Sequence, residues 1–289
     1  MRRQTKVHLV VVFLYTTLAL VLTWPLIRHL GTHVPGSYTW AFDEYTFLWN
    51  TWWFRYSLFD LAQNPLYSTY TFYPLGISLA LYTYNLTNAA LSLPLQPFLS
   101  LPAISNLTFL FATVLSGYGT FLLTHYLLDR LTPKAGEGTH RSLLSSMAAF
   151  LAGLIYAFGS YRLVYAAIGH YDMWSTAWIP LFVLYLVRTI WEPGFRNAFL
   201  AAVFVVLAML SEMIFGVFLG MLALLIVGFA LTKNARPAVA GGGFRPRKAA
   251  ARDGVDCYGA LRSDTGAHSR RDAGRLRTDR LGRRREAFR

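Results

Sequence analysis

The feature that most constrains this chain is a series of long apolar runs without strongly charged residues. The first of them, residues 7–27, contains no Lys, Arg, Asp or Glu. A helix needs about 20 such residues to cross about 30 Å of hydrocarbon, so this run is long enough to span a membrane. Its length, and the lack of an A-x-A-like site after it, favour an uncleaved anchor over a signal peptide.

The composition agrees with a membrane protein that crosses the bilayer several times. The chain of 289 residues is 55% hydrophobic and only 14% charged, whereas soluble domains carry about 25% charged residues. The aromatic share of 16% fits Trp and Tyr anchored at headgroup depth. We therefore predict an all-α polytopic membrane protein in a lipid bilayer.

The apolar runs predict about six transmembrane helices in a membrane domain of residues 1–234. The predicted spans are 7–27, 105–128, 143–160, 174–191, 197–211 and 213–231. A long first outer loop, residues 28–104, is expected to carry interfacial helices. The segment 84–102 is apolar enough to insert, but its prolines would interrupt helical hydrogen bonding.

The basic residues predict the orientation. Arg2, Arg3 and Lys6 precede the first run, which places the N-terminus in the cytoplasm. If 84–102 stays on the outer surface, the basic residues between 130 and 141 and those after 232 all lie inside, as the positive-inside rule requires. The prediction is a multi-pass protein of the cell membrane with both termini cytoplasmic.

The first outer loop contains two adjacent carboxylates in an aromatic stretch, "WAFDEYTFLWNTWWF" at 40–54. Read as a helix over 42–56, this stretch gathers its aromatic residues on one side and leaves Asp43 nearly opposite. The gathered residues are Phe42, Tyr45, Trp49, Trp52, Trp53 and Tyr56. The helix is expected to lie in the membrane interface, aromatic side down. The alternative is that Asp43 caps the helix and Glu44 occupies its first turn.

The second outer loop, 161–173, contains three strongly polar residues, Arg162, His170 and Asp172. His170 and Asp172 can supply a metal ligand or an acid–base pair, although a solvated turn explains them equally well. Glu212 lies between two apolar runs, where an ionisable group is a functional candidate or an ordinary turn residue.

The predicted topology brings all these polar residues to one side of the membrane. Acidic groups gathered there could hold a divalent cation or activate a hydroxyl nucleophile. Arg162 could bind a phosphate. The combination suggests chemistry on a lipid-phosphate substrate.

Several motifs, in this order, resemble the membrane glycosyltransferases of the C-type (GT-C) fold, and the resemblance covers about residues 1–232. The motifs are "TWPLIRHLG", "FDEY", "NPLYSTYTFYPLG", "GYGTFLLTHYLL", "AAFLAGLIYAFGSYR", "GHYDMWSTAWIPL" and "LSEMIFGVFLG". The chain looks most like the bacterial members of this family. They transfer a sugar from a polyprenyl-phosphate donor to a lipid or glycan acceptor at the extracytoplasmic face.

The resemblance implies roles for particular residues. Asp43 matches the acidic residue of the first loop that serves as general base or metal ligand, with Glu44 beside it. Phe42-Asp43 and the stretch from Gly169 to Asp172 resemble a cation site in oligosaccharyltransferase catalytic subunits. The expected site has catalytic Asp43 and Glu44, substrate-binding Arg162, His170 and Glu212, and Asp43 and Asp172 as ligands of Mg²⁺ or Mn²⁺.

The tail, residues 235–289, departs from the family pattern. From 245 onward it holds thirteen Arg and one Lys against five Asp and one Glu, and it lacks hydrophobic periodicity, so we predict disorder. Anionic lipid or nucleic acid could bind it, but a basic tail needs no specific partner, and no specific nucleic acid is expected. Members of the family usually run longer, so an inactive, C-terminally truncated fragment is one alternative function. A transporter or lipid-binding protein is another, disfavoured because the spans are almost free of charge away from their ends.

Overall fold

A computed structural model describes residues 2–36, 43–131, 139–170 and 175–235, and this part of the chain is mostly helical. The longer helices are α1 (Arg2–Leu22), α4 (Leu101–Leu131), α5 (Thr139–Phe158), α7 (Trp178–Trp191), α8 (Phe195–Ser211) and α9 (Met213–Ala235). Four stretches are long and apolar enough to cross a membrane, namely Thr5–Leu22, Leu101–Leu131, Leu143–Ala167 and Met213–Thr232. The prediction of an all-α membrane protein is confirmed at this level. Helices α7 and α8 are also apolar but shorter, with 14 and 17 residues.

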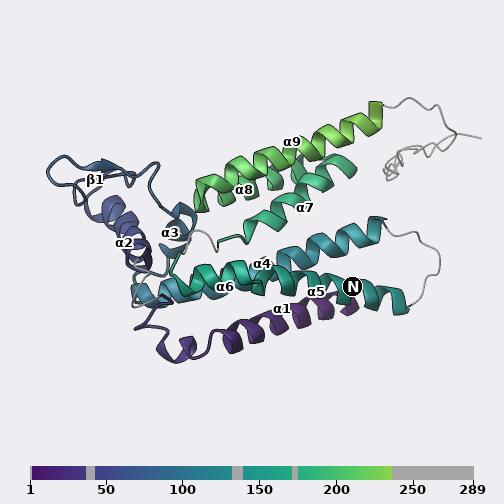
Figure 1. Ribbon diagram of the computed structural model, residues 1–289, viewed down its shortest axis with the longest axis horizontal. Helices are drawn as coiled ribbons and strands as arrows, with labels where there is room; N and C mark the ends of the chain where they lie inside the picture. The colour runs from purple at the N-terminus through teal and green to yellow at the C-terminus, as the bar shows by residue number, and fades with distance from the viewer. Residues whose placement is uncertain (1, 37–42, 132–138, 171–174, 236–289) are drawn as a thin grey trace, which may run out of the picture. The chain divides into compact units, whose positions relative to one another are not determined.

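Helices α1, α4 and α5 pack side by side (Figure 1). Tyr15 of α1 is fully buried, and its hydroxyl donates to the Phe150 carbonyl of α5. The Tyr15 ring lies against Gly117 of α4, where an added Cβ would come within 3.2 Å of it. Small residues at this crossing therefore let three helices approach closely around one aromatic side chain.

Helices α7, α8 and α9 form a second group, and α7 also contacts α4 (Figure 1). The core of this group includes Phe182, Ala201, Ala208 and Phe215. Many other apolar side chains of α9 are exposed, among them Leu224 at 76%. Such an apolar outer surface is typical of helices that face lipid.

The first loop contains several short elements. They are η1 (a 3₁₀ turn, Leu26–His29), α2 (Asp43–Arg55), η2 (a π-helical turn, Tyr56–Asp60), the antiparallel strands β1 (Tyr67–Ser68) and β2 (Ile77–Ser78), and α3 (Leu86–Ser92). The helix predicted over 42–56 is confirmed as α2, although Phe42 lies outside the described residues. Helix α2 contacts both α3 and α4, so the loop packs onto the helix ends.

The sequence suggested that the aromatic side of α2 faces lipid, and the structure covers part of this side with the first loop itself, while Tyr45 is 66% exposed. Trp53 is fully buried and stacks on Trp49 at 5.5 Å between ring centroids. The same cluster includes Leu79 and Tyr84, which follow strand β2. Burial raises the pKa of Tyr84 above its ordinary value, which keeps this hydroxyl neutral. The aromatic residues hold the loop together because it has enough apolar surface to cover them itself.

The segment 84–102 forms the short helix α3 and the turns that lead to α4. Asn85 caps α3 through its side chain, which accepts a hydrogen bond from the Asn88 amide. Pro94 and Pro97 follow the helix and prevent its extension. With seven residues, α3 is too short to cross a membrane.

Candidate active site

Asp43 and His170, far apart in the sequence, meet at the N-terminus of α2. Asp43 is the first residue of α2, where its negative charge is favourable to the helix dipole. The Nε2 atom of His170 lies 2.6 Å from the Asp43 Oδ2 atom. The side chains are 32% and 48% exposed, so the pair is accessible to a ligand. The joint placement expected for these two residues is what the structure shows.

Glu44, beside this pair, is buried. Its exposed fraction is 6%, and its Oε2 atom has no hydrogen-bond partner among the described residues. Burying a carboxylate without a partner costs free energy. The two adjacent acids therefore have opposite environments, which the sequence pattern did not indicate.

Two glycines make room for Glu44. An added Cβ at Gly36 would lie 2.9 Å from the Glu44 Cδ atom, and one at Gly169 would lie 2.9 Å from the Glu44 Cβ atom. Gly169 also has a φ of +74°, a conformation that glycine adopts without strain. Gly169 was recognised only as part of a motif, and sequence reasoning missed Gly36, since nothing local marks a glycine that contacts a distant side chain.

A second set of polar contacts joins the same two segments. The Asn85 and Asn88 side chains both donate to the Ser175 Oγ atom, at 3.0 and 2.8 Å. Thus the described residues on both sides of Asp172, His170 and Ser175, contact the first loop. Asp172 itself lies outside the described residues. Sequence reasoning missed Ser175 and the asparagines, because neutral polar residues carry no distinctive pattern.

The predicted second outer loop is partly helical. Residues Ser160–Ala167 form helix α6, which continues from α5 after a break at Gly159. Arg162 lies on α6 and is only 3% exposed, whereas we expected it on an open loop. The reason is that its guanidinium packs inward against α4 and the segment before α7, and each of these contributes a hydrogen-bond acceptor.

Two threonines accept hydrogen bonds from Arg162. Its Nη1 donates to Thr176 Oγ1 at 2.6 Å, and its Nη2 donates to Thr113 Oγ1 at 3.2 Å. Arg162 also lines a small pocket together with Leu22, Thr23 and other residues at the ends of α1, α4 and α5. A cation therefore borders a pocket within the helices, close to where α1 ends.

Glu212 is separate from the Asp43–His170 pair. It lies between α8 and α9, and its Oε1 atom accepts a hydrogen bond from the Ile214 amide at 3.5 Å. Within the described residues no hydrogen bond or ion pair joins Glu212 to Asp43 or His170. The geometry is that of a turn residue at a helix start, the alternative already considered for it.

The described residues contain no group of three or more His, Cys, Asp or Glu side chains arranged to hold a metal ion. Asp43 and Glu44 nevertheless present carboxylate oxygens, the ligand type that Mg²⁺ and Mn²⁺ prefer. The unpartnered Oε2 of Glu44 is an atom that a cation would satisfy.

No protein-family model, curated protein or solved structure matches this chain. The residues that meet around Asp43 are therefore the main guide to its function.

Proposed function

We propose that the chain is a membrane glycosyltransferase of the GT-C type, which transfers a sugar from a polyprenyl-phosphate donor to a glycan or lipid acceptor. The reaction takes place at the extracytoplasmic face, around Asp43, Glu44 and His170. The observation that carries the proposal is the pairing of Asp43 with His170 beside a buried Glu44 whose Oε2 atom has no hydrogen-bond partner among the described residues.

Stability alone does not account for this arrangement. An ion pair as exposed as Asp43 and His170 contributes about 0–1 kcal/mol, and the burial of Glu44 opposes folding. A buried polar atom without a hydrogen-bond partner needs an explanation other than stability, such as a catalytic role or a bound ion. The site also lies where the first loop packs onto the helix ends, next to apolar helices.

In the proposed step, the oxygen of an acceptor hydroxyl forms a bond to the anomeric carbon of the sugar. The bond between that carbon and the phosphate oxygen breaks, and its electron pair leaves with the polyprenyl phosphate. The carboxylate of Asp43 accepts the hydroxyl proton, as a general base does. His170 holds the Asp43 carboxylate in place, and Glu44 supplies a second carboxylate that can bind a divalent cation through its Oε2 atom.

The leaving phosphate requires positive charge. Arg162 is the cation that we assign to it, since a guanidinium can bind a phosphate through two hydrogen bonds. The proposal also includes a divalent cation, Mg²⁺ or Mn²⁺, held by Asp43 and Asp172. Such an ion would stabilise the charge that develops on the phosphate.

The proposal includes six membrane spans with both termini in the cytoplasm. Since Cys257 is the only cysteine, a Cys257→Ser background allows single cysteines at 43, 130 and 170 to be labelled in intact cells. We expect a membrane-impermeant maleimide to label positions 43 and 170 from outside and position 130 only after lysis. Labelling of 43 and 170 from opposite sides would overturn the topology and the site.

The direct test is a transfer assay in membranes, using radiolabelled polyprenyl-phosphate sugars, with wild-type chain and two variants. Asp43→Asn keeps the shape of the side chain but removes the base, so transfer should fall by about 10²-fold or more. Asp60→Asn is the matched control, because Asp60 lies in the same loop and pairs with Arg55 at 4.0 Å. If Asp43→Asn inserts normally into the membrane and transfers sugar at the wild-type rate, the proposal is refuted.

A further inference from the structure

A small pocket lies between α2, α3 and α4, on the same side of α2 as the carboxylates. Among its lining residues are Asn50 and Thr51 of α2, Asn88 and Ser92 of α3, and Ser105 and Thr108 of α4. Asn50 and Thr51 each lie seven residues after one of the two acids, so they share their helix face, about 10 Å along the axis. The lining residues carry no charge.

Three of the hydroxyl groups that line this pocket have already donated their protons. Thr51, Thr108 and Ser92 each donate their own proton to a backbone carbonyl, those of Phe47, Ile104 and Ala89. A hydroxyl oxygen that has donated its proton still has lone pairs to offer. The pocket wall therefore favours a ligand that donates hydrogen bonds.

Asn50 adds a buried acceptor. It is 2% exposed, and its Nδ2 atom donates to the Thr83 carbonyl at 2.7 Å, which fixes the orientation of the amide. Its Oδ1 atom has no hydrogen-bond partner among the described residues. An unpartnered buried acceptor of this kind costs about 1–3 kcal/mol unless a ligand or water satisfies it.

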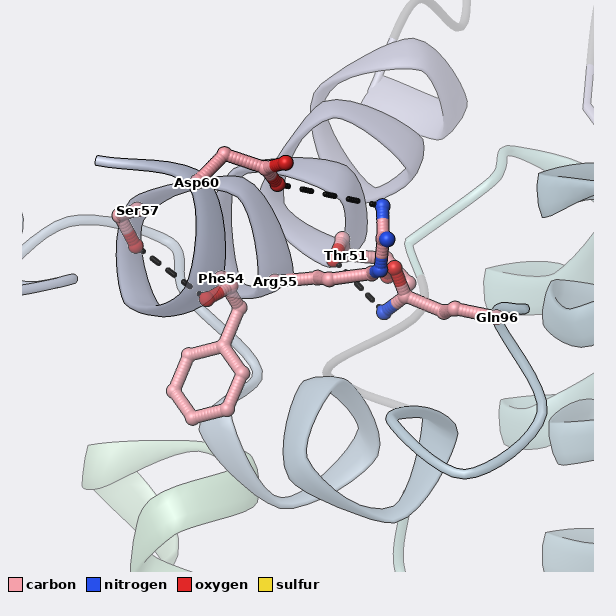
Figure 2. Close-up of polar contacts among 6 residues, drawn as sticks. All are labelled: Thr51, Phe54, Arg55, Ser57, Asp60 and Gln96. Atoms are coloured by element: carbon pink, nitrogen blue, oxygen red, sulfur yellow. Dashed lines mark hydrogen bonds and ion pairs between the residues drawn. The ribbon is translucent and has the colours of Figure 1, made fainter. Parts of the chain in front are cut away.

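Gln96 holds two of the lining residues in position. Its Nε2 atom donates to the Thr51 carbonyl at 3.0 Å and to the Ser92 Oγ atom at 2.9 Å. Figure 2 shows the Gln96 side chain reaching the backbone of α2 beside Thr51, from the turn that follows α3. Gln96 thus ties α2 to α3 at the pocket wall.

The geometry points to a sugar-recognition subsite, in which this pocket accepts a hydroxyl or hydroxymethyl group of an uncharged sugar. The pocket has room for about one water, so it holds one substituent of a ring and leaves the rest outside. Acceptor oxygens would repel a phosphate or a carboxylate, which assigns the phosphate of a substrate elsewhere. This inference rests on the proposed function and names its substrate class, a neutral sugar.

The test is saturation-transfer difference NMR on the full chain in nanodiscs, with mannose, glucose and galactose as probes and glucuronate as the anionic comparison. We expect a signal from at least one neutral hexose and a weaker one from glucuronate. In Asn50→Leu, which removes the buried acceptor, binding of that hexose should weaken about tenfold. In Asn197→Leu, an amide removed outside the pocket lining, it should stay unchanged.

Ser105→Leu guards against misfolding of Asn50→Leu. It fills the pocket from α4 and introduces a good helix former, and it should weaken hexose binding to the same extent. Unchanged binding in both pocket variants, or no hexose signal from the wild type, would overturn the subsite. Asp43→Asn should retain hexose binding, so the subsite is tested independently of transfer. If the wild-type chain binds a hexose in the pocket but shows no transfer, only the proposed function is refuted.

Discussion

The charged side chains at the two ends of the helices have different environments. At the end formed by α4 and the connection from α7 to α8, Arg130 forms an ion pair with Glu192, and both side chains are 44% exposed. Arg188 lies over the Tyr126 ring at 4.7 Å. At the end where the first loop packs, one carboxylate is half exposed beside a histidine, and its neighbour is buried without a hydrogen bond to its Oε2 atom.

This difference separates the charges that stability explains from those that it does not. Arg130 and Glu192 form a solvent-exposed ion pair, which is common at helix ends and contributes little to stability. Glu44 has no such explanation, since folding would favour a neutral residue in its place. The two glycines that accommodate it show that the surrounding chain is built around the carboxylate.

The largest expected difference between the two ends is in their effect on catalysis. Glu44→Gln keeps the shape of the side chain and removes a carboxylate that supports the cation, so transfer should fall by up to about 10²-fold while thermal stability is retained or rises. Glu192→Gln is the control at the other end, and it should leave transfer unchanged. Normal transfer by Glu44→Gln would mean that the charge of Glu44, like that of Glu192, has no catalytic role.

A smaller effect is expected from the glycine that contacts Glu44. Gly169→Ala introduces a Cβ into a left-handed backbone and against the Glu44 side chain, which should lower the free energy of unfolding by about 2 kcal/mol. Gly220→Ala on α9, where nothing lies within 4 Å, should cost nothing. Thermal shift of the detergent-solubilised protein measures both, and equal shifts would contradict the close packing around Glu44.

The smallest effect is expected at the opposite end. Arg130→Gln removes an exposed ion pair, so the melting temperature should fall by an amount equivalent to less than about 1 kcal/mol, and raising the salt concentration should shrink the difference. Transfer should be unaffected. A large loss of stability would mean that this end, too, depends on its charges.

Much of the helical framework was predictable because its signals are local. The apolar runs led to long helices, and the aromatic residues at spacings of three, four and seven led to α2 between Asp43 and Arg55. Asp43 and His170 were predicted to meet, since the topology places both at one face, and they do.

Which segments are apolar enough for lipid and which are helical can be read from the sequence, because hydropathy and periodicity depend on neighbours in the chain. The fold was needed to show that the loop covers Trp53, that Arg162 points inward to Thr113 and Thr176, and that Glu44 is buried between Gly36 and Gly169. Burial and hydrogen bonding depend on segments that come together only in the fold, and one residue's type does not reveal its distant partner.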